Sequence, residues 1–280
     1  MRRDSMTQTI VFIHGAWVTP SSWDPFRTWF IERGYDCIAP AWPGKDRPID
    51  AIRADPSPLL GIGIGEIADH FEQVIRALPE PPILIGHSFG GLIVQILLDR
   101  GLGVCGVAID PAPPKGVLAV EPSAFRSLAS VLLTWRGWRK VVRWSYGNFR
   151  YAFVHSLPED EARAAYDTQV TPETGRVFFQ GALAGFSRHS PATVDFRNDA
   201  RAPLLILAGA DDHIVPVSLV RRNYRKYATS SAVTDFQEFP GRTHWIIAQE
   251  GWQDVAGFAL DWIREHDPRS STDSAGSETT

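Results

Sequence analysis

The chain has 280 residues, of which 44% are hydrophobic and 21% are charged, with a formal net charge of -4. This length allows one domain with a full hydrophobic core, and the charge gives no electrostatic reason to expect nucleic-acid binding. Near the start, residues 10–13 form an apolar run that is too short for a secretory signal, and no stretch approaches the length of a membrane-spanning helix. We therefore expect a cytoplasmic protein that contacts neither membranes nor nucleic acid.

Apolar, strand-like runs alternate with helical patterns along most of the chain. The predicted strands are residues 9–13, 35–39, 82–86, 104–109, 203–209 and 234–239, and the predicted helices are residues 23–33, 66–78, 90–100 and 245–265. Strands that are apolar throughout and separated by helices are typical of a parallel sheet with both faces covered. The pattern predicts an α/β fold with a mostly parallel sheet of about six strands and helices on both faces.

One long segment breaks this alternation. Residues 111–202 contain Pro-rich turns and helix-like stretches but no convincing buried strand. We interpret them as a helical cap inserted into a core formed by residues 1–110 and 203–266. The remaining residues, 267–280, are rich in Ser and Thr and lack aromatic side chains, so we expect a disordered tail.

Neither the cysteines nor the glycine-rich stretches indicate a cofactor. Cys37 and Cys105 lie in separate apolar runs and are predicted to be buried thiols, which suits a reducing cytosol. No spacing of cysteines and histidines typical of a metal site occurs in the sequence. The stretch GIGIGE at 61–66 resembles a phosphate loop, but no predicted strand precedes it and it lacks the third glycine of the dinucleotide motif. We expect no metal and no cofactor.

The sequence GHSFG, residues 86–90, lies between a predicted strand and a predicted helix. It matches the G-x-S-x-G pattern, in which a serine occupies a sharp turn and is exposed at the carboxyl edge of the sheet. The N-terminus of the following helix favours negative charge at that place. The pattern predicts Ser88 as a nucleophile, and an ordinary glycine-rich turn is the alternative.

A serine nucleophile needs a base that takes its proton and an acid that orients the base. Asp211 and Asp212 lie in the loop after the strand at 203–209, and His244 lies in the loop after the last strand. Serine, acid and histidine in this chain order form one known solution to the geometry. For each residue taken alone, the alternatives are a surface histidine at a helix start and aspartates that cap a loop or helix.

Four segments carry a resemblance to a known family: VFIHGAW, GHSFGG, GADDHIVP and GRTHW. Through them the chain resembles the α/β-hydrolases over residues 9–265, apart from the cap. In that family the acid lies three residues after the glycine that ends its strand, and a proline follows four residues later. Gly209, Asp212 and Pro216 fit this spacing. The resemblance therefore implies an α/β-hydrolase fold with Asp212 as the acid.

The resemblance also ranks other residues of the site. Asp211 is the second choice for the acid, and Asp110 is the third because some members place their acid at the end of that strand. The family's oxyanion donors are two backbone N–H groups, which map to Ala16 and Phe89 here. His14 is expected to brace the loop of the first donor rather than to act as a base.

These residues predict a serine hydrolase that cleaves carboxylic esters, lactones included. The reaction would pass through an acyl-enzyme on Ser88, with His244 as base and Asp212 as orienting acid. Epoxide and haloalkane hydrolases carry Asp at the elbow, so Ser88 argues against their chemistry. The short segment before the first strand resembles plant methylesterases and hydroxynitrile lyases. A hydroxynitrile lyase or a cofactor-free perhydrolase on the same triad is the alternative, followed by a non-enzymatic ligand receptor.

Aromatic and basic residues are concentrated in one part of the cap. Residues 122–158 contain no Asp or Glu but several Arg, Trp, Tyr and Phe. We predict that rings from the cap and from the core loops line an apolar pocket for a small-molecule ester or lactone. The predicted lining residues are Trp17, His87, Trp135, Trp138, Phe149, Phe153 and Trp245. For the basic residues, a solvated surface is favoured over attachment to anionic lipid.

Overall fold

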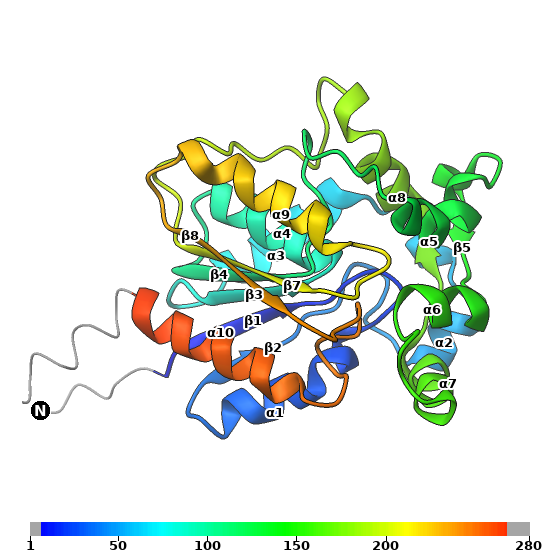
Figure 1. Ribbon diagram of the computed structural model, residues 1–280, viewed down its shortest axis with the longest axis horizontal. Coiled ribbons are helices and arrows are strands. Elements are labelled where there is room, and N and C mark those ends of the chain that lie inside the picture. Colours follow the sequence, from blue (N-terminus) through cyan, green and yellow to red (C-terminus); the bar gives the residue numbers. More distant parts are fainter. Residues whose placement is uncertain (1–6, 268–280) are drawn as a thin grey trace, which may run out of the picture.

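The computed structural model describes residues 7–267 and contains a six-stranded sheet, shown in Figure 1. Its strands are β1 Thr9–Ile13, β2 Asp36–Ile38, β3 Ile83–His87, β4 Cys105–Ile109, β7 Leu204–Gly209 and β8 Thr234–Phe239. They pair in the order β2-β1-β3-β4-β7-β8, and every pairing is parallel. The prediction of a parallel sheet of about six strands is confirmed.

Helices cover both faces of the sheet. The helices on one face are α1 Asp24–Ile31 and α10 Trp252–His266, and those on the other are α3 Ile64–Arg76, α4 Phe89–Asp99 and α9 Val217–Lys226 (Figure 1). Strand β1 shows why both faces are apolar: Ile10 and Phe12 pack towards α1 and α10, whereas Val11 and Ile13 pack towards α3 and α4. Alternate residues of a strand point to opposite faces, so only a fully apolar strand fits between two layers of helices.

The chain between β4 and β7 forms a separate group of elements at one end of the sheet, on the right in Figure 1. It contains α5 Pro122–Leu132, α6 Tyr146–Ala152, α7 Glu159–Gln169 and α8 Gly175–Ala182, and a two-stranded antiparallel sheet of β5 Val141–Val142 and β6 Glu173–Thr174. This is the segment that we interpreted as a helical cap, and we call it the cap. The small sheet was not predicted, because strands of two residues leave no periodic pattern in the sequence.

Short helices complete the described structure. They are α2 Ile49–Ala54 and single 3-10 turns at Pro20–Trp23, Ser57–Leu59, Gly137–Arg139, Ala184–Phe186 and Tyr227–Thr229. Within residues 7–267, no helix is both long and apolar enough to span a bilayer. Cys105 is buried as predicted, whereas Cys37 is only half-buried. The predicted disordered tail lies almost entirely at residues 268–280, outside the described part of the chain.

The last helix begins later than predicted. Residues 245–251 form turns, and α10 starts only at Trp252. The N–H of Trp245 donates to the carbonyl oxygen of Phe153 at 3.2 Å, which ties this segment to the cap. Gly251, directly before the helix, has a φ of 77°, a left-handed conformation that a helix interior excludes.

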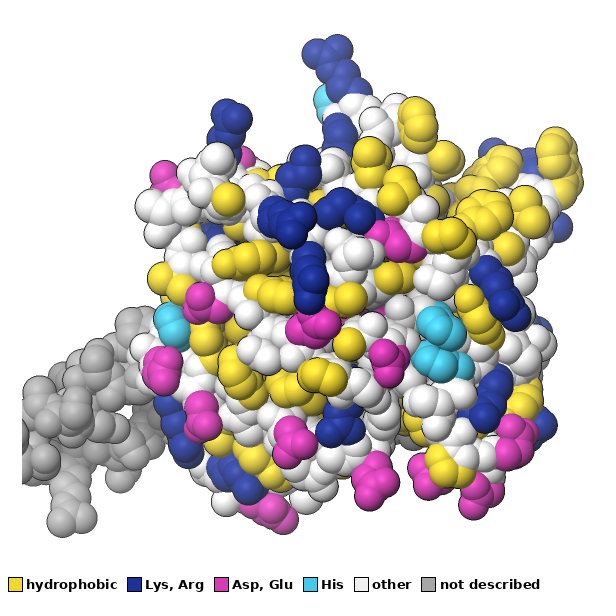
Figure 2. Space-filling view, viewed as in Figure 1, with side chains coloured by type: hydrophobic (Ala, Val, Ile, Leu, Met, Phe, Trp, Pro, Cys, Tyr) yellow, Lys and Arg dark blue, Asp and Glu magenta, His cyan; other side chains and the backbone are white. Residues whose placement is uncertain are grey.

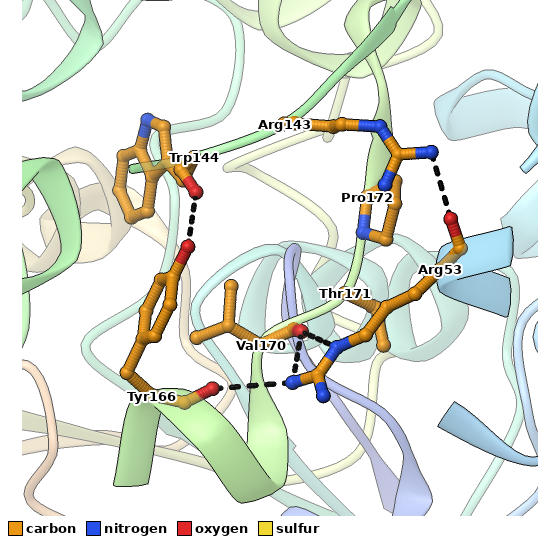
Figure 3. Close-up of a pocket in the computed structure, with 7 residues that line it drawn as sticks. All are labelled: Arg53, Arg143, Trp144, Tyr166, Val170, Thr171 and Pro172. Carbon is orange, nitrogen blue, oxygen red and sulfur yellow. Dashed lines mark hydrogen bonds between the residues drawn. The ribbon is translucent and has the colours of Figure 1, made fainter. Parts of the chain in front are cut away.

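Hydrogen bonds join the cap to α2 of the core (Figure 3). The guanidinium of Arg53 donates to the carbonyl oxygen of Val170 at 2.8 Å and to that of Tyr166 at 3.3 Å. Arg143 of the cap donates back to the carbonyl oxygen of Arg53 at 2.7 Å. The Tyr166 hydroxyl donates to the carbonyl oxygen of Trp144 at 2.7 Å. These bonds fix the backbone of the cap beside Trp144, whose ring contacts a loop of the active site.

Candidate active site

Ser88 occupies a strained turn between β3 and α4. Its backbone has φ 57° and ψ -121°, and its N–H donates to the carbonyl oxygen of Ile109 at 2.9 Å. The turn requires glycine on both sides: a Cβ on Gly86 would lie 2.2 Å from the carbonyl oxygen of Gly90, and one on Gly90 would lie 2.0 Å from that of Ile13. The sequence pattern therefore produces the elbow that it predicted, with a residue held in a conformation that costs about 1–3 kcal/mol.

Asp212 and His244 meet at the ends of the neighbouring strands β7 and β8. Asp212 Oδ2 lies 2.5 Å from His244 Nδ1, and both side chains are completely buried. Asp212 Oδ1 accepts hydrogen bonds from the N–H groups of Ile214 at 2.7 Å and Val215 at 2.8 Å. The loop thus holds the carboxylate in place, and the carboxylate orients the imidazole with its Nδ1 towards the acid.

The ring of His244 is held between two aromatic neighbours, and its other nitrogen is uncommitted. Its centroid lies 4.5 Å from those of His87 and Phe153. Burial, and then the His244 ring, lower the pKa of His87 well below its usual value, so His87 is neutral and its Nε2–H donates to the carbonyl oxygen of His244 at 2.9 Å. Within residues 7–267, His244 Nε2 forms no hydrogen bond, including none with Ser88. Such bonds often tighten only when substrate is bound.

The two other candidates for the acid occupy different environments. Asp211 is exposed, whereas Asp110 is fully buried at the end of β4. Asp110 Oδ1 accepts a hydrogen bond from the N–H of Gly209 at 2.7 Å. Burial, and then the charge of Asp212, raise the pKa of Asp110 well above its usual value. The structure therefore places two carboxyl groups side by side behind His244, and the raised pKa of Asp110 favours the neutral form of that one.

The predicted oxyanion donors lie on either side of Ser88. Phe89 is the first residue of α4, where backbone N–H groups have no partner within the helix. Ala16 lies in the loop after β1, which passes close to the nucleophile, because a Cβ on Gly15 would lie 2.8 Å from the Cβ of Ser88. The structure thus brings both residues next to the serine.

His14 begins this loop and is fully hydrogen-bonded. Its Nδ1 donates to the carbonyl oxygen of Gly15 at 2.8 Å, and its Nε2 accepts from the N–H of Trp42 at 3.1 Å. Burial, and then the charge of Lys45, lower the pKa of His14 well below its usual value. A neutral histidine with both ring nitrogens occupied is suited to bracing the loop, as the sequence analysis expected.

Trp17 connects the same loop to the cap. It has a φ of 64°, which is uncommon for a residue other than glycine. Its ring stacks between those of Trp144 and Phe178, with centroids 3.4 and 4.3 Å away. Its carbonyl oxygen accepts a hydrogen bond from the N–H of Thr171 at 2.7 Å. Contacts from three parts of the cap thus hold the loop in a strained conformation.

A buried ion pair lies behind this loop and was not foreseen from the sequence. Lys45 Nζ of the core lies 2.6 Å from Glu173 Oε2 of the cap, and both side chains have zero exposure. Glu173 Oε2 also accepts from the N–H of Trp17 at 3.1 Å, and Lys45 Nζ donates to the carbonyl oxygen of Val18 at 2.9 Å. The pair therefore binds the backbone on both sides of Trp17. No motif contains either residue, so sequence reasoning had no signal for it.

A cavity of about 580 Å³ opens between Ser88 and the cap. Its walls include Phe89, Val117, Leu128, Phe178 and Val215. Ser88 and Glu121 are the only lining residues with a side-chain oxygen, and Glu121 is bound by the Ser218 hydroxyl at 2.5 Å and by Arg222. Ser88 is therefore at the wall of an almost entirely apolar chamber, whose volume is within the range of about 300–1,000 Å³ typical of small-molecule sites.

A family model described as the alpha/beta hydrolase family matches residues 10–258. The chain is an α/β-hydrolase. The match covers most of the chain, and it agrees with the resemblance carried by the four sequence segments. No curated protein sequence matches the chain.

Solved structures with the same fold align over almost the whole chain. A monoacylglycerol lipase from Paleococcus ferrophilus is 22% identical, with a TM-score of 0.64 over 93% of this chain and 96% of that one. A pyrethroid hydrolase from Sphingobium faniae is 16% identical, with a TM-score of 0.66 over 91% and 97%. An extracellular α/β-hydrolase from a Paenibacillus species is 18% identical, with a TM-score of 0.66 over 91% and 98%. At these identities the similarity shows the fold alone.

The cavity of this α/β-hydrolase differs from the predicted pocket. Of the seven predicted lining residues, Trp17 lines the cavity and the other six do not. Trp135 and Trp138 have 80% and 43% of their surface exposed. The other four residues are buried in the protein and do not reach the cavity: His87, Phe149, Phe153 and Trp245. The prediction missed Phe178 and Leu128, because a count of aromatic residues cannot tell which face of a cap helix points inward.

Three buried side chains of this α/β-hydrolase also have the spacing of a metal site. One nitrogen or oxygen atom from each of His87, Asp110 and His244 lies within 4.8 Å of the others. The hydrogen bonds of His244 to Asp212 and of His87 to the His244 carbonyl account for this grouping. We therefore assign the three groups to the network around the imidazole.

Proposed function

We propose that this α/β-hydrolase is a serine hydrolase that cleaves carboxylic esters through an acyl-enzyme on Ser88. The observation that carries the proposal is the buried Asp212–His244 pair, with 2.5 Å between carboxylate and imidazole, at the sheet edge where Ser88 occupies its strained turn. Each of the three residues has a conformation or contact that the reaction needs.

In the proposed reaction, His244 Nε2 takes the proton of the Ser88 hydroxyl as Oγ attacks the ester carbonyl. The N–H groups of Ala16 and Phe89 donate to the oxyanion that forms, and Asp212 stabilises the imidazolium. The alcohol leaves with the proton from His244. Water then attacks the acyl-enzyme, giving its proton to His244, and the second tetrahedral intermediate releases the acid and returns the proton to Ser88.

The cavity favours an uncharged ester with a sizeable apolar group, lactones included. Its walls offer dispersion contacts and almost no hydrogen-bond partners apart from Ser88. A charged group would lose its hydration there without compensation, because Glu121 is already bound by Ser218 and Arg222. We therefore expect the turnover of neutral esters to rise with the length of the acyl chain until the cavity is full.

The first test compares wild type with Ser88→Ala on p-nitrophenyl butyrate, with folding checked by circular dichroism. Wild-type turnover and background activity in the variant would support the proposal. A folded wild type that cleaves no ester of a chain-length and lactone series would contradict it. Mandelonitrile cleavage, peracid-dependent bromination and ligand retention without turnover then distinguish the lyase, the perhydrolase and the receptor.

A further inference from the structure

Exposed hydrophobic side chains are concentrated on the cap. Among the described residues, eight of the twelve large hydrophobic side chains that are exposed lie between positions 118 and 186. Figure 2 shows hydrophobic side chains gathered on the cap side of the molecule, over α5 and α8. Single exposed apolar residues are normal on a soluble protein, but a contiguous group marks an interaction site.

One part of this group surrounds the opening of the cavity. Leu118, Val120, Phe125 and Phe186 line the cavity and are also exposed, Phe186 to 91%. We call these four residues the apolar rim. Because the rim continues into the walls around Ser88, whatever covers it also controls entry to the nucleophile.

A second part combines tryptophan with positive charge. In the loop 134–140, sequence TWRGWRK, the rings of Trp135 and Trp138 are exposed. Arg136, Arg139 and Lys140 are exposed as well, and they form no ion pair within the described residues 7–267. We call this segment the basic loop. Tryptophan beside lysine or arginine is the composition of segments that lie at a membrane–water interface.

The basic loop is fixed next to a wall of the cavity. The ring of Trp138 packs edge-on against Phe179 of α8, with centroids 5.5 Å apart. The backbones are in close contact, since a Cβ on Gly175 would lie 2.1 Å from the carbonyl oxygen of Gly137. Helix α8 also contributes Phe178 to the cavity. The basic loop therefore packs directly against the helix that forms part of the cavity wall.

We propose that the cap of this protein docks onto an anionic lipid surface through the basic loop and the apolar rim. The cations would contact lipid phosphates, Trp135 would enter the interfacial layer, and the cavity would open towards the lipid. This reverses the expectation of no membrane contact, which rested on the lack of a membrane-spanning stretch and on a solvated interpretation of the basic residues of the cap. Docking itself does not depend on the proposed ester hydrolysis; only the delivery of an ester from lipid to Ser88 does.

Two other occupants of this surface are less suited to it. A second copy in a two-fold dimer would bring identical surfaces together, and residues 122–158 contain cations but no Asp or Glu to pair with them. A protein bound permanently to the rim would cover the opening through which Ser88 is reached. A lipid surface matches the charge and can supply apolar molecules to the cavity.

The experiment is flotation of the full-length Ser88→Ala protein with phosphatidylcholine vesicles, with or without about 25% phosphatidylglycerol. We expect the protein to float with the anionic vesicles, to float much less with the neutral ones, and to lose binding as salt is raised to about 0.5 M. The serine variant keeps the measurement independent of catalysis, and wild-type activity on a dissolved ester is measured separately.

Two pairs of variants test the basic loop and Leu133, an exposed residue directly before it. Leu133→Ser with Trp135→Ser should weaken vesicle partitioning at least about tenfold. Arg139→Gln with Lys140→Gln should weaken it about fivefold for each cation removed, and only with anionic vesicles. Neither pair lines the cavity, so hydrolysis of dissolved p-nitrophenyl butyrate should stay at the wild-type rate.

The matched controls lie outside the basic loop and the apolar rim. Ile31→Ser removes an exposed apolar side chain from α1, and Arg225→Gln with Lys226→Gln removes two adjacent cations from the last turn of α9. They should leave partitioning unchanged. The proposal is overturned if wild type floats with neither vesicle, or if loop and control variants bind equally. It is also overturned if sedimentation shows a dimer that Trp135→Ser dissociates, which would assign the surface to a second copy.

Discussion

The sheet core and the cap bury apolar side chains to different extents. In the core, strands β1, β3, β4 and β7 consist almost entirely of buried residues between two layers of helices. In the cap, helix α5 has only three buried residues, and large side chains such as Phe125 and Trp135 face solvent. The core thus fixes the reacting groups, whereas the cap shapes a chamber and presents a surface. The proposed reaction thus depends on the tightly packed core, whereas access to the cavity depends on the exposed apolar side chains of the cap.

The two regions meet at the loop after β1. Trp17 is stacked between cap rings, and its N–H donates to Glu173, the cap partner of buried Lys45. The oxyanion donor that we assign, Ala16, directly precedes it. The boundary between core and cap therefore lies beside the proposed oxyanion donor, so that changes in the cap should alter the proposed chemical step.

The largest expected effect is on kcat, and it tests the acid of the proposed triad, which lies entirely in the core. Asp212→Asn removes the charge that stabilises the His244 imidazolium, and kcat should fall about 10⁴-fold in steady-state hydrolysis of p-nitrophenyl butyrate. The exposed neighbour serves as control, since Asp211→Asn should stay within about twofold of wild type. A large loss in Asp110→Asn together with a small one in Asp212→Asn would move the acid to Asp110.

The next effect tests the junction of core and cap, by which we mean the loop of Trp17 and the buried Lys45–Glu173 pair behind it. Glu173→Gln leaves buried Lys45 without its counter-charge, which costs about 3–5 kcal/mol of unfolding free energy. Glu173 accepts from the N–H groups of Trp17 and Thr174 through its two oxygens, and glutamine has only one, uncharged, acceptor oxygen, so the loop of Trp17 should be held less well and kcat should fall more than KM rises. Urea unfolding and steady-state kinetics measure the two quantities.

Further variants separate the effect of the Lys45–Glu173 pair on stability from its effect on the position of the Trp17 loop. Lys45→Met with Glu173→Met should recover much of the stability, as apolar replacements of buried pairs often do, yet remain slow. Glu159→Gln breaks the pairs of exposed Glu159 with Arg150 and Arg163 and should cost less than about 1 kcal/mol. If kcat stays at the wild-type value in every variant of the pair, its role is confined to stability.

A smaller effect tests the cap as the wall of the chamber. Leu128→Gln places an amide in the apolar cavity, so kcat/KM for p-nitrophenyl octanoate, relative to the acetate, should fall about tenfold. Leu183→Gln changes an exposed cap leucine that does not line the cavity, and the ratio should not change. Equal ratios in both variants would mean that the acyl group binds elsewhere.

The smallest effect concerns the pH dependence of stability. The pKa of Asp110 is raised in the folded protein, so between its ordinary value and the raised value the folded state holds a proton that the unfolded chain has released. Stability should therefore fall as pH rises through this window. Asp110→Asn removes the titration and keeps the bond from Gly209, so urea unfolding from about pH 4.5 to 8 should show a flatter profile. An unchanged slope would refute the assignment of a neutral Asp110.

Much of the core could be predicted from the sequence because its signals are local. Apolar runs of five or six residues predicted the strands, and GHSFG predicted the elbow because only glycine fits where Gly86 and Gly90 nearly touch neighbouring carbonyls. The spacing from Gly209 to Asp212 and the loop of His244 placed both residues at one sheet edge, where parallel strands end together. The family follows from these same segments.

Only the tertiary structure shows which side chains of the cap are buried and which contacts join the cap to the core. Trp135 and Phe149 both lie in the aromatic part of the cap sequence, yet one is exposed and the other fully buried, because Phe149 packs against Tyr166 and Trp245, contacts that the local sequence does not specify. The Lys45–Glu173 pair and the stack of Trp17 on Trp144 join residues more than a hundred positions apart. Sequence determines which groups the chain can use and the turns that hold them, whereas burial is a property of contacts that form only when the chain has folded.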